Sequence, residues 1–193
     1  MARNYKMIHF LQNEMEGMDN KAASMIIRMF NRLDERKIYA SALSTSVTLY
    51  LALSYIGLLP KLVLGTVQYQ GLSYPHAWIE MNDKVFDLAI YGDTRYHPML
   101  TESHDVKAVL PQINVGYADT NEINYYPFQF GSTWAMADMK RLVGKTLKEY
   151  ADKSPVFNIW SDVCYILELS ATSGNLEKME EIASNATIND SEA

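Results

Sequence analysis

Two runs of β-favouring residues on either side of Asn82-Asp83 are the feature that most limits the folds open to this chain. Asn-Asp is a turn dipeptide, so residues 75–90 predict a β-hairpin with a two-residue loop. Because side chains on a strand alternate between two faces, His76 and Asp87 fall on the same face. They are then diagonal neighbours, roughly 7–8 Å apart at the backbone, which is within reach of a hydrogen bond. The hairpin therefore predicts an imidazole that is oriented by a carboxylate.

The two faces of this hairpin differ in character. The face of the imidazole is expected to carry His76, Trp78, Glu80, Val85, Asp87 and Ala89. The opposite face is apolar throughout and is expected to carry Ala77, Ile79, Met81, Phe86, Leu88 and Ile90. We expect the apolar face to lie on a hydrophobic core.

Composition restricts the class of protein. The 193 residues are 48% hydrophobic and 21% charged, as in ordinary globular domains. A net charge of −6 with no basic stripe argues against binding to nucleic acid or to acidic membranes. The only cysteine, Cys164, excludes an intrachain disulfide and fits a reducing compartment. The charged N-terminus lacks the apolar segment of a signal peptide. The longest apolar run, 47–59, is too short to span a bilayer. We therefore expect a soluble, cytoplasmic protein.

Hydrophobic periodicity predicts the order of the other elements. Helices are expected at 5–16, 20–36, 42–56, 134–152, 155–171 and about 174–184, and a strand at 62–69. Residues 91–133 have weak periodicity and hold either one or two more strands, at 108–113 and 125–130, or long loops. This order predicts an α+β fold in which the central helix 42–56 packs on an antiparallel sheet, with additional N- and C-terminal helices. We divide the chain into a core (1–133), a C-terminal helical extension packed on it (134–184) and a polar tail (185–193).

A helix, a strand and then a His/Asp hairpin occur in the same order in a known group of enzymes. The residues that carry this likeness are Gly57, Leu64-Gly65-Thr66-Val67, His76-Ala77-Trp78-Ile79-Glu80 and Asp87. Over roughly residues 38–90 the chain resembles the transglutaminase-like, papain-related superfamily of Cys-His-Asp thiol enzymes. It is especially similar to the bacterial leader-peptide-processing proteases that mature lasso peptides such as microcins. In those proteins a Cys-Leu-x-x-Ser pattern is expected where this chain has Ala42-Leu43-Ser44-Thr45-Ser46.

The resemblance implies a function and a set of site residues. It implies a nucleophilic cysteine at the position of Ala42, a proton shuttle at His76 and an orienting carboxylate at Asp87. The substrate would be a peptide or protein amide, with leader-peptide proteolysis favoured, and a small leader-recognition partner protein would accompany it. No cofactor and no metal are expected.

Three further residues are candidates for substrate binding. Trp78 shares the face of His76 and is a candidate wall of the site, although packing is its simplest role. Ser41 stands at the start of the central helix, where a serine most often caps the helix. Gln68 is a candidate donor to an oxyanion, as are Tyr69 and a backbone N–H at the helix start.

Position 42 holds a methyl group where this chemistry needs a thiol. A helix N-terminus and a nearby imidazole both lower a thiol pKa, and alanine can use neither. Three explanations stay open: Ala42 is an engineered replacement for cysteine, the chain is a naturally degenerate relative that kept the fold for binding, or Ser41 or Ser44 acts as a surrogate nucleophile. Cys164 is expected to be a buried, inert thiol in the middle of a helix.

Two rival functions use the same residues. One is a non-catalytic module that binds a peptide or a partner protein, and the other is a small-molecule acyltransferase of the kind that arylamine N-acetyltransferases represent. The sequence does not decide between hydrolysis and transamidation. His97 and His104 lie near acidic residues, but without the tight spacing of metal ligands.

Overall fold

The computed structural model describes residues 2–103, 106–120, 122–129 and 134–189, which form a mixed helix and antiparallel-sheet structure of the α+β class. The α-helices are α1 (Ala2–Glu14), α2 (Asn20–Glu35), α3 (Ala42–Tyr55), α4 (Ala89–Tyr96), α5 (Trp134–Lys140), α6 (Leu147–Ala151), α7 (Ile159–Leu167) and α8 (Ser173–Asn185). A π-helical turn η1 (Met99–Ser103) and a 3₁₀ turn η2 (Tyr117–Asp119) follow α4. The strands are β1 (Lys61–Tyr69), β2 (Leu72–Met81), β3 (Lys84–Asp87), β4 (Gln112–Val115) and β5 (Asn124–Pro127).

The sheet has five strands in the order β4-β3-β2-β1-β5, and every neighbouring pair is antiparallel. In the predicted hairpin, Ile79 pairs with Phe86, Glu80 with Val85 and Met81 with Lys84, so its register is confirmed. Asn82 and Asp83 both have positive φ, at 53° and 59°. Positive φ at both loop residues is the conformation of a type I′ turn, whose twist matches that of the flanking strands.

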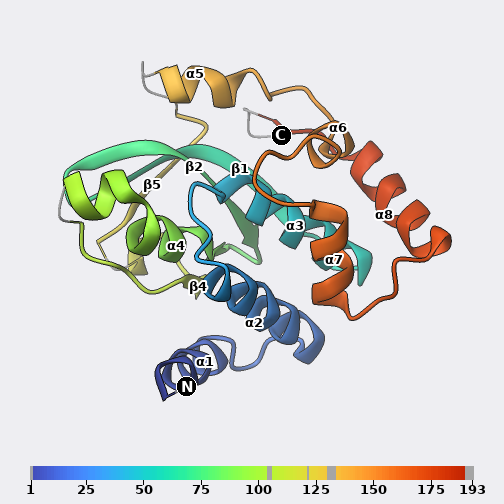
Figure 1. Ribbon diagram of the computed structural model, residues 1–193, viewed down its shortest axis with the longest axis horizontal. Helices are drawn as coiled ribbons and strands as arrows, with labels where there is room; N and C mark the ends of the chain where they lie inside the picture. Colours follow the sequence, from blue (N-terminus) through green and yellow to red (C-terminus); the bar gives the residue numbers. More distant parts are fainter. Residues whose placement is uncertain (1, 104–105, 121, 130–133, 190–193) are drawn as a thin grey trace.

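Helix α3 is the centre of the main hydrophobic core. It packs on β1 and β2, and α2, α7 and α8 surround its other sides (Figure 1). Ala77, Ile79 and Met81 face this core, as predicted, whereas Trp78 lies in a smaller cluster with β1 and β5 residues. Because α3 is covered on all sides, it needs the nearly continuous apolar sequence from which its burial was predicted.

Several predicted boundaries differ from those in the structure, and the expected helix 155–171, for example, is limited to α7. The hairpin ends at Asp87 rather than at residue 90, because α4 begins at Ala89. Ala89 therefore packs in the main core and Ile90 in the smaller cluster with Trp78, the reverse of the prediction. The expected helix 134–152 is interrupted, because Gly144 takes a left-handed φ of +84° and Thr146 starts α6 with a capping box.

Of the two alternatives left open for residues 91–133, strands are the one that forms. They are β4 and β5, at 112–115 and 124–127, and each is shorter than the range considered for it. The expected polar tail is anchored as far as Ile188, which is fully buried and exchanges backbone hydrogen bonds with Gly144 and Lys145. In the described part of the chain no helix is long and apolar enough to cross a membrane.

Candidate active site

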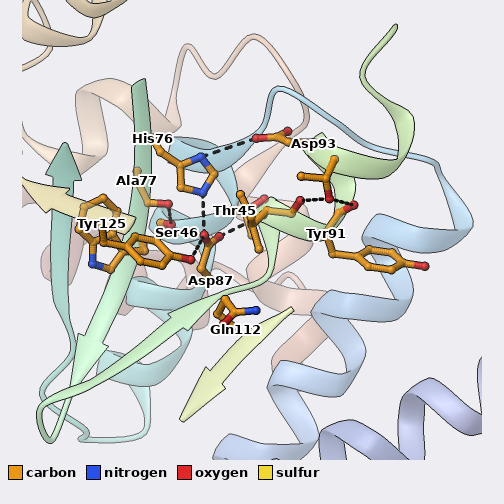
Figure 2. A network of polar contacts seen from close by, with 12 residues as sticks. Thr45, Ser46, His76, Ala77, Asp87, Tyr91, Asp93, Gln112 and Tyr125 are labelled. Atoms are coloured by element: carbon orange, nitrogen blue, oxygen red, sulfur yellow. Dashed lines mark hydrogen bonds and ion pairs between the residues drawn. The ribbon is translucent and has the colours of Figure 1, made fainter. Parts of the chain in front are cut away.

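His76 and Asp87 form the buried pair that the hairpin predicts. His76 lies on β2, Asp87 is the last residue of β3, and His76 Nε2 is 2.8 Å from Asp87 Oδ2 (Figure 2). Their exposed fractions are 0% and 1%. The predicted contact is confirmed by this hydrogen bond, in which Nε2–H donates to the carboxylate when the ring is neutral.

The Asp87 carboxylate is fixed by two further donors. The Tyr125 hydroxyl donates to Oδ2 at 2.7 Å, and the Ile90 backbone N–H donates to Oδ1 at 3.1 Å. Burial raises the pKa of Tyr125 well above its ordinary value, and the Asp87 carboxylate raises it further, so the hydroxyl keeps its proton. Asp87 is therefore held in one orientation, and it holds the imidazole in turn.

The second nitrogen of the ring, Nδ1, is buried and has no hydrogen-bond partner. The nearest charged group to it is the carboxylate of Asp93, on α4, whose Oδ2 lies 3.6 Å from Nδ1 (Figure 2). The other oxygen, Oδ1, accepts the backbone N–H of Ala40 at 2.6 Å. Asp93 thus connects the free side of the imidazole with the segment that leads into α3.

Close packing of α4 makes this contact possible. A Cβ atom added at Gly92 would lie 2.3 Å from the carbonyl oxygen of Ile38, so only glycine allows α4 to approach that segment. Ala40 has a φ of +50°, which is uncommon for a residue with a side chain. Its hydrogen bond to Asp93 offsets part of that strain.

The two carboxylates determine the charge on the ring. Burial alone would lower the pKa of His76, but Asp87 and then Asp93 outweigh it, so the pKa lies above its ordinary value. Burial raises the pKa of Asp93 above its ordinary value, and His76 and the Ala40 N–H oppose this only in part. The other titratable groups near the cluster are Tyr74, Tyr125 and His97.

Ala42 is the first residue of α3, and two contacts place the helix start near His76. Asp93 is one of them, because it binds the backbone of Ala40. The other is Ser46, whose Oγ donates to the carbonyl oxygen of Ala77 at 3.0 Å, next to His76 on β2. Residues four apart share one face of a helix, so Ala42 lies one turn before Ser46 on the side that faces β2.

The start of α3 has no side-chain cap. Ser41 occupies the N-cap position, as predicted, but its hydroxyl pairs with the Thr45 hydroxyl at 3.0 Å and makes no cap hydrogen bond. The first backbone N–H groups of a helix carry partial positive charge. An uncapped start can therefore stabilise an anion.

The other hydroxyl and thiol groups that the sequence singled out are engaged or buried elsewhere. Ser44 Oγ lies 2.8 Å from the Tyr150 hydroxyl and 3.0 Å from Ser154 Oγ, so it faces the C-terminal helices. Cys164 is 5% exposed, and burial raises its pKa. Neither arrangement activates a nucleophile.

The structure places Trp78 and Gln68 away from the imidazole's hydrogen bonds. Trp78 is fully buried, its Nε1 donates to the Tyr117 hydroxyl at 3.0 Å, and its ring lies 4.9 Å from that of Tyr125. Gln68 Oε1 accepts from the Tyr126 hydroxyl at 3.1 Å, and the β1 residue that pairs with His76 is Gly65. Trp78 therefore supports the site through Tyr125 rather than forming an open wall.

Sequence reasoning missed Asp93, Tyr125 and Ala40 as parts of this centre. The signals were weak: Asp93 lies in a helix that was not predicted, and Tyr125 reaches Asp87 only through the pairing of β5 with β1. Among the described residues no group of three or more His, Cys, Asp or Glu could hold a metal ion, and His104 lies outside them.

Compared with protein-family models, with curated proteins and with solved structures, the chain matches none of them.

Proposed function

We propose that the His76 centre is the acid–base half of a transglutaminase-like thiol site that acts on a peptide or protein amide. The observation that supports this most directly is the asymmetry of the imidazole. Nε2 is bound to a fixed carboxylate, and Nδ1 is left without a hydrogen-bond partner. A histidine arranged in this way can exchange a proton at one defined atom.

With a cysteine at position 42 each group has a step to perform. The uncapped start of α3 and the imidazolium favour the thiolate, which attacks the amide carbonyl. The Nδ1 proton passes to the leaving amine, and water or a second amine then releases the acyl group. Asp87 holds the ring and stabilises its charged form throughout.

With alanine at position 42 the chain lacks the atom that attacks. The hydroxyls of Ser41 and Ser44 are both paired with other side chains, so they do not support a surrogate nucleophile. The chain with alanine therefore binds a peptide without cleaving it. Either Ala42 replaces a catalytic cysteine, or the chain is a naturally inactive relative that kept the fold for binding. The resemblance to leader-peptide proteases favours a peptide substrate and hydrolysis.

The test is to restore the thiol and titrate it. Ala42→Cys is made in a Cys164→Ala background, and the ultraviolet absorbance of the thiolate is followed against pH. The matched reference is Leu59→Cys in the same background, because Leu59 is 91% exposed and reports an unperturbed thiol. We expect the pKa of the thiol at position 42 to lie about 2 units or more below that of the reference.

A second variant shows whether His76 causes the shift. His76→Asn in the Ala42→Cys chain should return most of the thiol pKa to the reference value and slow alkylation by iodoacetamide at neutral pH. A thiol at position 42 that titrates like the reference would overturn the enzyme proposal and leave the non-catalytic binding module. If His76→Asn does not fold, the comparison between positions 42 and 59 decides alone.

A further inference from the structure

We infer that Asp93 is a second positioning residue of the His76 centre, with one oxygen facing the free side of the imidazole and the other holding the segment that leads into α3. This rests on the proposed function, because both effects serve position 42. The geometry alone assigns the role: Oδ2 is 3.6 Å from His76 Nδ1, and Oδ1 is 2.6 Å from the Ala40 nitrogen. The residue is 5% exposed, so its carboxylate is largely shielded from solvent.

The first effect is on charge. His76 lies between two buried carboxylates, one hydrogen-bonded to Nε2 and one at ion-pair distance from Nδ1. A protonated ring balances one of these charges and attracts both, whereas a neutral ring leaves two buried anions close together. Asp93 therefore favours the imidazolium, the form that gives a proton to a leaving group.

The second effect is on backbone position. Ala40 has a left-handed conformation, and the segment before α3 is pressed against α4 at Gly92. The Asp93 hydrogen bond is the side-chain contact that fixes Ala40 there. Because Ala40 lies two residues before Ala42, this contact aligns the first turn of α3 with the imidazole.

Two substitutions separate the effects. Asp93→Asn removes the charge but keeps an oxygen that accepts the Ala40 N–H, whereas Asp93→Ala removes both. Asp34→Asn is the matched control, because Asp34 also binds α4, through the hydroxyls of Tyr91 and Tyr96, and has no contact with His76.

The readouts are the NMR titration of the His76 ring and hydrogen exchange of the Ala40 amide, both in the chain with Ala42. In Asp93→Asn we expect the titration midpoint of His76 to fall by roughly 1–2 pH units, with Ala40 exchange kept within about threefold of the unsubstituted chain. In Asp93→Ala the midpoint should fall similarly and Ala40 exchange should become about tenfold faster or more. Asp34→Asn should change neither.

Three results would overturn the inference. An unchanged midpoint in Asp93→Asn would mean that Asp93 is neutral or electrostatically remote. Unchanged hydrogen exchange of the Ala40 amide in Asp93→Ala would show that Asp93 does not position this segment. An equal shift of the His76 titration midpoint in Asp34→Asn would show that the shift is not specific to Asp93. If Asp93→Ala does not fold, Asp93→Asn and the control still decide the effect on charge. None of these measurements uses the thiol at position 42, so they can fail separately from the proposed function.

Discussion

Two ion pairs with a buried aspartate differ in the kind of cation. Arg32, on α2, donates from Nε at 2.8 Å and from Nη2 to the same oxygen of Asp162, on α7. His76 donates from β2 to Asp87 on β3 and lies next to Asp93 on α4. An arginine stays protonated at any pH that a folded protein tolerates, whereas a histidine changes charge near neutrality.

This difference separates a structural contact from a chemical one. The Arg32–Asp162 pair connects an N-terminal helix to a C-terminal helix. The His76 centre has a proton that can move, and a ring nitrogen without a hydrogen-bond partner. Both pairs are expected to stabilise the fold, but only the stability due to His76 should depend on pH around neutrality.

The largest effect is expected from Asp162→Ala. It leaves Arg32 mostly buried without its partner, and removal of one member of a buried pair costs about 3 kcal/mol or more. Urea unfolding should show the same loss at every pH between about 6 and 9. A loss below about 1 kcal/mol, or one that varies with pH, would break the comparison.

Asp87→Ala should cost slightly less, about 2–3 kcal/mol, because it leaves the donors of His76, Tyr125 and Ile90 without their acceptor. Unlike the loss in Asp162→Ala, this loss should be larger at pH 6 than at pH 9, since Asp87 stabilises the protonated ring. Urea unfolding at both pH values measures it. Equal losses would show that the ring is not charged in the folded protein.

The unsubstituted chain should itself lose stability as pH rises. The pKa of His76 is raised in the folded state, so the stability it contributes is complete below the unfolded value of about 6.5 and is lost as pH rises through the folded value. The slope should be steepest between the unfolded and the folded pKa values, and it can reach at most about 1.4 kcal/mol per pH unit. Urea unfolding at a series of pH values across that range measures the slope. The free energy of unfolding should depend less on pH in His76→Asn, and an equally steep dependence in that variant would assign the slope to other groups.

The smallest effect is expected from Ser46→Ala, at about 1 kcal/mol. Ser46 donates to the Ala77 carbonyl and joins α3 to β2 beside His76. Besides this pH-independent loss in urea unfolding, the thiol pKa of Ala42→Cys should rise when Ser46→Ala is added, since the helix start is then less firmly held. A thiol pKa that does not move would show that this bond has no part in alignment.

The parts of the site that the sequence predicts are those fixed by local geometry. The two-residue turn at Asn82-Asp83 sets the register, and the register brings Asp87 to His76. The nearly all-apolar sequence of 42–56 likewise identifies the central helix, and Gly57 marks its end with a φ of +87°.

The parts that the sequence does not predict depend on non-local packing. Tyr125 meets Asp87 because β5 pairs with β1, and nothing in the sequence near residue 125 specifies that pairing. Asp93 was missed because α4 starts directly after a strand, with Tyr, Gly and Thr residues that do not favour a helix. The wrong helix 134–152 has a local signal, since Gly144 and the Thr146–Glu149 capping box are both visible in the sequence.

The central claim is that the start of α3 lies at the free nitrogen of His76, and the most direct test is the NMR titration of that ring in Ala42→Cys with Cys164→Ala. If the two groups are neighbours, the His76 Nδ1 resonance shifts as the thiol ionises, at the same pH midpoint as the thiolate absorbance. The titration midpoint of the ring itself should also be higher than in the chain with Ala42. A ring titration identical in the two chains, with no inflection at the thiol midpoint, would contradict the account.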